Sequence, residues 1–261
     1  MSFMSRVDAT TTAEWAELVA ELDRWGEAGR VASLWWRDDD AVAATPRLDA
    51  LLRLAGEVPL GLAVIPADAQ PELAAVLTPF PQVAVLQHGW CHANHAASGK
   101  KSEFPPGRRA AAIAADLTAG QARLRALFGP RAPPVFVPPW NRFAAEFLPL
   151  LEAAGIAGLS SMAASTAPAL PREIARIDVH IDLVAWKQDR GFIGAPAAIA
   201  GLVGELRGRR LGTEDPDAAT GILTHHLVMD RGTAGFLDRL LALVDGHGAA
   251  RWAAVAERLN R

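Results

Sequence analysis

Residues 31–40 read Val-Ala-Ser-Leu-Trp-Trp-Arg-Asp-Asp-Asp, a largely apolar run that stops abruptly in charged side chains. A short continuous apolar run is typical of a strand buried on both faces, as in a parallel sheet. Thr45 and Pro46 follow as an N-cap and a first helical turn. The stretch therefore predicts a buried strand with carboxylates at its carboxyl end, and then a helix.

The rest of the chain repeats this alternation of strand and helix. A first helix is indicated before residue 29, where Trp15, Leu18, Leu22 and Trp25 recur at helical spacing. We expect strands near residues 60–65, 83–87, 135–137, 157–161, 174–184 and 221–225. We expect helices near residues 71–77, 144–154, 197–206, 235–244 and 251–259, and a long helix that ends near 128–129.

Alternation of this kind implies parallel pairing with right-handed crossovers, in a closed barrel or an open doubly wound sheet. Of these two α/β architectures we expect the barrel, because polar residues fall at the carboxyl ends of several strands, where a barrel builds its site. We predict one domain over residues 1–261, in which residues 1–29 form an N-terminal extension and helix.

Composition narrows the possible partners. The net charge is −3 and no dense stripe of Lys or Arg occurs, so nucleic acid is not an expected partner. The N-terminus lacks the apolar segment of a signal peptide, and no run is long enough for a membrane span, so we expect a cytoplasmic protein. The one cysteine, Cys91, excludes an internal disulfide. The sequence leaves the oligomeric state open.

Two polar clusters indicate metal chemistry. Asp38, Asp39 and Asp40 repel one another, so they require a neutralising cation unless they lie in a solvated turn. His88 and His92 lie four residues apart, and neutral imidazoles are good ligands for Zn²⁺ and similar ions. A carboxylate with two imidazoles leaves positions open for water and substrate, as a catalytic metal site requires.

These residues resemble the motifs of polysaccharide deacetylases. Residues 36–40, followed by Thr-Pro at 45–46, resemble the first motif, and the His-x-x-x-His of 88–92 resembles the second. Pro-Pro-Trp at 138–140 resembles the third, and Leu-Thr-His at 223–225 resembles the fifth. The resemblance implies a distorted (β/α) barrel, often of seven strands, that removes acetyl groups from N- or O-acetylated sugars.

The resemblance also implies roles for individual residues. Asp39, His88 and His92 would hold one divalent ion, with zinc expected and cobalt, nickel or manganese as alternatives. A metal-bound water would attack the acetyl carbon, with Asp38 as the general base. His225 would be the general acid for the leaving group, rather than its neighbour His226.

The fourth motif is the weakest match. Asp182 is the candidate to orient His225, with Asp178 as the alternative. Leu223 would line the acetyl methyl pocket, and the backbone N–H of Trp140 would stabilise the oxyanion. The expected substrate-binding residues are Trp140, Leu223, Pro139, Trp90 and Trp186.

Several positions depart from the motifs. Asp40 stands where the family has Gly, Gly89 where it has Ser or Thr, and Val137 where it has an Arg that contacts the base. Arg37 or Arg142 could supply the missing guanidinium. We expect residues 100–103 to be a solvated loop, with a lid over the site as the alternative.

Three functions stay open on the sequence alone. The first is an acetyl-removing hydrolase, and the second opens another C–N bond, such as that of a cyclic amide or ureide, at the same metal site. Product analysis separates these two. The third is a catalytically impaired carbohydrate-binding relative, which turnover with metal bound would exclude.

Overall fold

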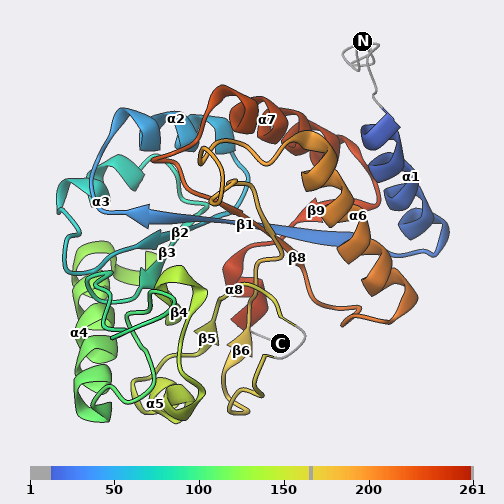
Figure 1. The fold of residues 1–261 in the computed structure, drawn as a ribbon. Helices are drawn as coiled ribbons and strands as arrows, with labels where there is room; N and C mark the ends of the chain where they lie inside the picture. Colours follow the sequence, from blue (N-terminus) through green and yellow to red (C-terminus); the bar gives the residue numbers. More distant parts are fainter. Residues whose placement is uncertain (1–12, 165–166, 260–261) are drawn as a thin grey trace.

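The protein is described by a computed structural model over residues 13–164 and 167–259 (Figure 1). The nine strands of these residues form one sheet in which every strand pairing is parallel. They are β1 (Ala32–Ala41), β2 (Leu60–Val64), β3 (Val83–His88), β4 (Val135–Val137), β5 (Gly158–Leu159), β6 (Ala175–Arg176), β7 (Ile181–Asp182), β8 (Thr220–Thr224) and β9 (Ala250–Trp252).

The sheet is a curled, distorted (β/α) barrel, as predicted. Its order is β6-β5-β4-β3-β2-β1-β8-β7, so eight strands lie along the path rather than seven. The extra strand arises because the single strand expected at 174–184 is divided into β6, which pairs with β5, and β7, which pairs with β8. Only residues 177–180 separate β6 from β7, so this segment joins the two ends of the path.

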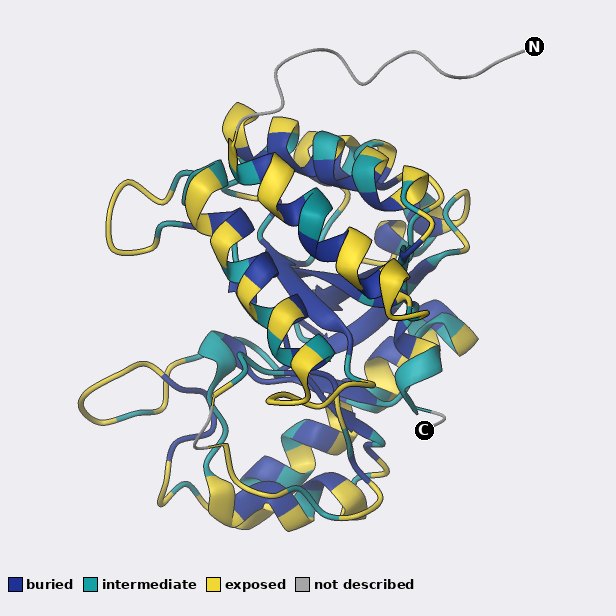
Figure 2. Cartoon of the chain, turned by 90° about the vertical axis from the view of Figure 1, so that its right-hand side faces the viewer, coloured by how far each residue is buried: buried dark blue, intermediate teal, exposed yellow. Residues whose placement is uncertain are grey.

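The α-helices are α1 (Ala13–Glu27), α2 (Pro46–Ala55), α3 (Glu72–Leu77), α4 (Ala110–Phe128), α5 (Leu148–Ala153), α6 (Ala195–Leu211), α7 (Arg231–Gly246) and α8 (Val255–Leu259). Those up to α7 cover the outside of the sheet, whereas Val255 and Leu259 of α8 pack against the interior cluster around Trp35. The predicted start of α2 is confirmed, because Oγ1 of Thr45 accepts a hydrogen bond from the Leu48 N–H at 3.1 Å. Figure 2 shows the exposed outer faces of the helices and the buried strands beneath them.

The helix predicted over residues 251–259 is too long at its start. Residues 250–252 form β9, which pairs with Ala32, Ser33 and Leu34 of β1. This part of β1 precedes Trp36, where pairing with β2 begins, so β9 supplies a partner for that part of the strand. None of the helices in the described part of the chain is long and apolar enough to span a bilayer.

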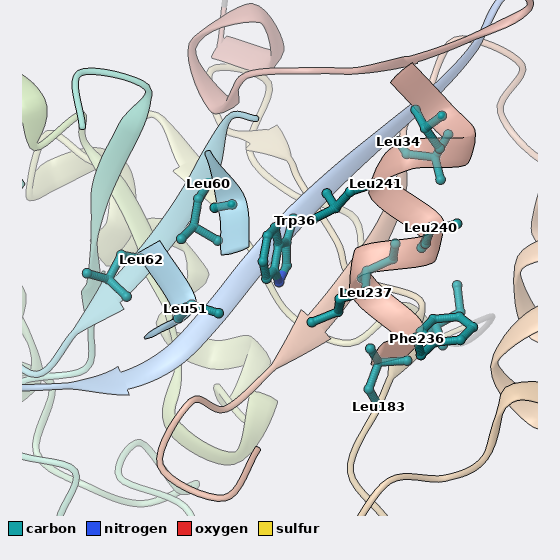
Figure 3. Close-up of a cluster of buried hydrophobic side chains, with 14 of the residues drawn as sticks. Leu34, Trp36, Leu51, Leu60, Leu62, Leu183, Phe236, Leu237, Leu240 and Leu241 are labelled. Carbon is teal, nitrogen blue, oxygen red and sulfur yellow. The ribbon is translucent and has the colours of Figure 1, made fainter. Parts of the chain in front are cut away.

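The two adjacent tryptophans of β1 face opposite sides of the sheet. Trp35 packs with Val137 and Leu223 inside the barrel. Trp36 belongs to the cluster beneath the helices, together with Leu60 of β2 and Leu237 of α7 (Figure 3). Because side chains alternate along a strand, this arrangement fixes which of the following charged residues point into the barrel.

Candidate metal centre

The charged end of β1 follows the same alternation. Arg37 faces inward: its Nη1 donates to Oγ of Ser160 at 2.7 Å, and Ser160 directly follows β5 on the far side of the barrel. Asp38 faces outward, where Oδ2 accepts from Thr224 Oγ1 at 2.6 Å and Oδ1 lies 2.5 Å from Nδ1 of His226. Asp39 faces inward again, beside Arg37. Neighbouring carboxylates of one strand therefore have separate environments.

A β-bulge redirects the third aspartate. Asp38 pairs with Leu62 of β2 and Ala41 with Val64, so two residues of β1 oppose the single residue Ala63. Asp40 has a φ of 72°, in the left-handed region that Asp tolerates better than most residues. Bulges re-aim side chains, and this one lets Asp39 and Asp40 both approach the barrel mouth.

Asp40, His88 and His92 form a group whose ligand atoms all lie within 4.8 Å of one another. Oδ1 of Asp40 lies 3.1 Å from Nε2 of His88 and 3.4 Å from Nε2 of His92. His88 ends β3, and His92 returns to the site through a tight loop with a φ of 55°. The cluster joins the carboxyl ends of β1 and β3, which lie on either side of β2 in the sheet.

The donor set fits a cation. Nδ1 of His88 lies 3.1 Å from the carbonyl oxygen of Val137, which can only accept a hydrogen bond. Neutral His88 then carries its proton on Nδ1 and presents the Nε2 lone pair to the Asp40 carboxylate. Nε2 of His88 and Oδ1 of Asp40 are both electron-rich and lie 3.1 Å apart, so they need a proton or a metal ion between them. A carbonyl that orients the other ring nitrogen is also the usual support of a metal-bound histidine.

Burial and the close approach of charged groups shift the pKa values of Asp40, His88 and His92. Burial disfavours charge on Asp40, but hydrogen bonding and the charge of His88, with smaller effects of His225 and His92, hold its pKa below the usual value. Burial likewise lowers the pKa of His88, but the charges of Asp39 and Asp40 outweigh it and raise that pKa above 6.5. Burial and then the charge of His88 lower the pKa of His92.

Asp39, the ligand expected from the sequence, is not in this group. Its Oδ2 accepts from Arg37 Nη2 at 3.0 Å, and its Oδ1 lies 2.8 Å from Arg37 Nε without hydrogen-bond alignment. Arg37 is completely buried and also donates to Oδ1 of Asn141 at 2.7 Å. Arg37 therefore places a guanidinium against Asp39, whereas Arg142 donates to the backbone oxygen of Lys101.

Asp38, the base expected from the sequence, lies on the other side of β1 from the group of Asp40, His88 and His92. It is fully buried between Thr224 and His226, and Nε1 of Trp36 donates to the same threonine hydroxyl at 2.8 Å. The one-residue displacement has a physical cause. The resemblance assigns the site to the first two aspartates, but strand alternation and the bulge bring the second and third to the barrel mouth.

His225 and His226 point in different directions. His226 binds Asp38 on the outer side, whereas His225 lies close enough to Asp40 and Asp182 for its charge to act on both. Among the described residues, none makes a hydrogen bond with the buried Nδ1 of His225. The Trp186 ring meets the His225 ring nearly edge-on, with centroids 4.7 Å apart.

The expected partners of His225 contact other groups. Asp182 accepts from Nε1 of Trp186 at 2.7 Å and from the Val184 N–H at 3.0 Å. Burial, the largest effect, raises the pKa of Asp182, although these bonds and His225 oppose it. Asp178, the alternative, accepts from Ser161 at 3.0 Å.

The expected substrate-binding residues surround the cluster at different depths. The ring centroid of Trp140 lies 4.3 Å from that of His92, and Trp186 is 44% exposed. Leu223 is fully buried in the barrel interior. Pro139 is also buried, and Trp90 is half-buried.

Cys91 lies between the two histidines without joining the cluster. Burial and the nearby charge of Glu103 raise the pKa of its thiol. A protonated thiol is a poor metal ligand and a poor nucleophile.

Two residues at or beside the cluster are not expected there from the sequence. Asp40 stands out only as a departure from a motif, and Glu103 is expected in a solvated loop. Strand alternation after Trp36 is the feature of the sequence that indicates that Asp38 and Asp39 diverge.

Comparison with known proteins places the fold. No protein-family model and no curated protein matches the sequence. A protein from Mycobacterium smegmatis, provisionally described as a polysaccharide deacetylase, is similar with a TM-score of 0.64 and 18% identity, over 89% of this chain and 90% of the other.

Two further solved structures share the fold. A family 4 acetyl xylan esterase from Clostridium thermocellum, in complex with a cobalt ion, has a TM-score of 0.53 at 13% identity, over 87% of this chain and 90% of its own. A mutant of a family 4 carbohydrate esterase pseudoenzyme, with restored activity, has a TM-score of 0.55 at 14% identity, over 88% of this chain and 68% of its own. The fold is thus that of polysaccharide deacetylases, and it occurs in both active and inactive members.

Proposed function

We propose that the protein is a metal-dependent hydrolase that removes acetyl groups from a carbohydrate or a related small molecule. The observation that carries the proposal is the convergence of Asp40, His88 and His92, whose ligand atoms lie within 4.8 Å of one another at the carboxyl ends of β1 and β3. The fold shared with acetylesterases and deacetylases supports it. We revise the carboxylate ligand from Asp39 to Asp40.

A divalent ion held by these three residues would supply Lewis acidity, polarising the acetyl carbonyl and lowering the pKa of a water. Asp39 takes the role of general base in place of Asp38, because it adjoins Asp40 and its charge acts on His88. Arg37 holds Asp39 with two nitrogens, which fixes the direction of the carboxylate. The proton of the attacking water passes to an Asp39 oxygen.

His225 donates a proton to the departing oxygen or nitrogen. Its ring lies nearly edge-on against Trp186, whose indole N–H donates to Asp182 at 2.7 Å, so Trp186 links the two groups. Trp186 and Trp140 offer aromatic surfaces beside the cluster, and such surfaces stack well on sugar rings. These contacts favour a carbohydrate over a compact cyclic amide.

The test measures metal content by elemental mass spectrometry and acetate release from acetylated xylan and chitin oligosaccharides, after reconstitution with Zn²⁺ or Co²⁺. Wild type should hold about one ion per chain and release acetate, whereas the His88→Ala/His92→Ala variant should do neither. A wild-type protein without bound metal contradicts the proposal. A metal-loaded protein that opens cyclic amides but releases no acetate supports the alternative C–N hydrolase.

A further inference from the structure

The loop between the two histidines wraps around a buried carboxylate, that of Glu103. Oε1 of Glu103 accepts from the Cys91 N–H at 2.9 Å and from the Trp90 N–H at 3.2 Å. Oε2 lies 3.3 Å from the same Trp90 nitrogen. The Glu103 side chain thus binds the main chain of two of the three residues between His88 and His92.

Glu103 is completely buried, and within residues 13–164 and 167–259 no Lys, Arg or His forms an ion pair with its carboxylate. Burying a carboxylate is costly unless it is paired or hydrogen-bonded. Here the compensation comes from backbone N–H groups, which point at one spot only when the 89–92 loop holds this conformation. The carboxylate and the loop conformation therefore depend on each other.

Gly89 makes room for this contact. It has a φ of 61°, and a Cβ at this position would overlap Oε2 of Glu103 and the ring of Pro139. Any larger residue would displace the carboxylate from the loop. The glycine at this position is thus matched to the glutamate fourteen residues later.

Glu103 is itself fixed from the other side. Its backbone oxygen accepts from Nη1 of Arg108 at 3.2 Å, and the preceding Ser102 N–H donates to Oδ1 of Asn94 at 3.0 Å. Phe104, which follows, is fully buried against Phe136. Only the first part of residues 100–103 is a solvated loop, since Ser102 and Glu103 are buried.

The geometry points to Glu103 as a positioning residue for the metal centre: its carboxylate fixes the 89–92 backbone and so aims the imidazole of His92 at Asp40 and His88. The assignment rests on the proposed metal site. His92 directly follows Cys91 and has a φ of 55°, an uncommon conformation that the surrounding contacts must enforce. Without the Glu103 carboxylate, the 89–92 loop loses the contact that holds His92 in this arrangement.

The first experiment titrates the full-length apo protein with Co²⁺, following affinity and the visible absorption of the ion. Glu103→Ala should bind Co²⁺ about 10–100-fold more weakly than wild type, the range for residues that support metal ligands, and Glu103→Gln should lie between the two. Glu21→Gln is the matched control, because Glu21 is also completely buried but pairs with Arg210 far from the site. Unchanged Co²⁺ affinity and spectrum in Glu103→Ala would overturn the assignment.

The second experiment measures amide hydrogen exchange at residues 88–92 in the apo protein, so it does not depend on metal binding. The Trp90 and Cys91 amides should lose protection in Glu103→Ala and keep it in Glu21→Gln. Wild-type protection in Glu103→Ala contradicts the anchoring role. A wild-type chain that shows this protection but binds no Co²⁺ contradicts the proposed function and the aiming of His92, and leaves the loop anchor standing.

Discussion

Asp38 and Asp39 are adjacent in the sequence but lie on opposite sides of β1, with Asp38 bound to His226 and Thr224 and Asp39 bound to Arg37. Two carboxylates that look equivalent in a motif therefore have different surroundings. Mutations of the two aspartates should therefore have different consequences.

Asp39→Asn and Asp40→Ala should fail in different ways. Asp40→Ala removes a proposed ligand, so it should lose both bound metal and activity. Asp39→Asn should keep the metal and lower kcat by about 10²–10⁴-fold, the usual contribution of a general base. Metal content and acetate release on the same preparations check this. Loss of metal from Asp39→Asn with retention in Asp40→Ala would restore Asp39 as the ligand.

Asp38→Asn should be a stability variant. It weakens a buried contact with His226 that lies outside the barrel, so we expect the free energy of unfolding to fall by about 1–3 kcal/mol. Metal stoichiometry should stay at the wild-type value. Urea unfolding measures the loss of stability, and elemental analysis measures the metal stoichiometry. A folded, metal-loaded Asp38→Asn protein with wild-type stability but little turnover would return the base role to Asp38.

Arg37→Met should destabilise the fold. It leaves the Asp39 carboxylate buried without its partner, which typically costs about 3–5 kcal/mol. Arg142→Met is the control, because the Arg142 guanidinium donates to the backbone oxygen of Lys101 in an exposed position and its loss should cost under about 0.5 kcal/mol. Thermal and urea unfolding of both variants measure the difference. Equal effects would show that the guanidinium of Arg37 does not support Asp39.

The affinity for metal should rise with pH, and the rise should extend to a higher pH than for a histidine ligand of ordinary pKa. Protons and metal compete for Nε2 of His88, and the pKa of His88 is raised above 6.5 by Asp39 and Asp40 against the opposing effect of burial. Below that raised pKa, Zn²⁺ affinity should increase up to about tenfold per pH unit, and above it the dependence should flatten. Calorimetry in buffers of different ionisation enthalpy counts the released protons. A flat affinity between pH 6 and 7 would contradict the competition.

Replacement of Trp186 should affect catalysis through two contacts. Trp186→Phe keeps a ring edge against His225 but removes the indole N–H that Asp182 accepts. We expect kcat/KM to fall by about tenfold, the effect of one lost hydrogen bond of about 1.4 kcal/mol, with metal content unchanged. Trp25→Phe, which removes a distant indole bond to Leu206, is the control. Equal losses in both variants would indicate a general effect on folding.

The sequence by itself determined the alternating architecture. Apolar runs that end in charged residues, and caps such as Thr45, depend on local chemistry, so β1 and α2 could be predicted directly. The resemblance of spaced motifs also brought His88 and His92 into the site region, because strand ends of a barrel meet at one mouth.

Only the tertiary structure decided which carboxylate meets the histidines. A β-bulge depends on the register between β1 and β2, which residues 31–40 do not encode alone. The division of the 174–184 segment into β6 and β7 likewise depends on which strand each half finds as a partner. Contacts such as those of Arg37 with Ser160 and Glu103 with Cys91 link distant residues, so only the folded chain brings them together.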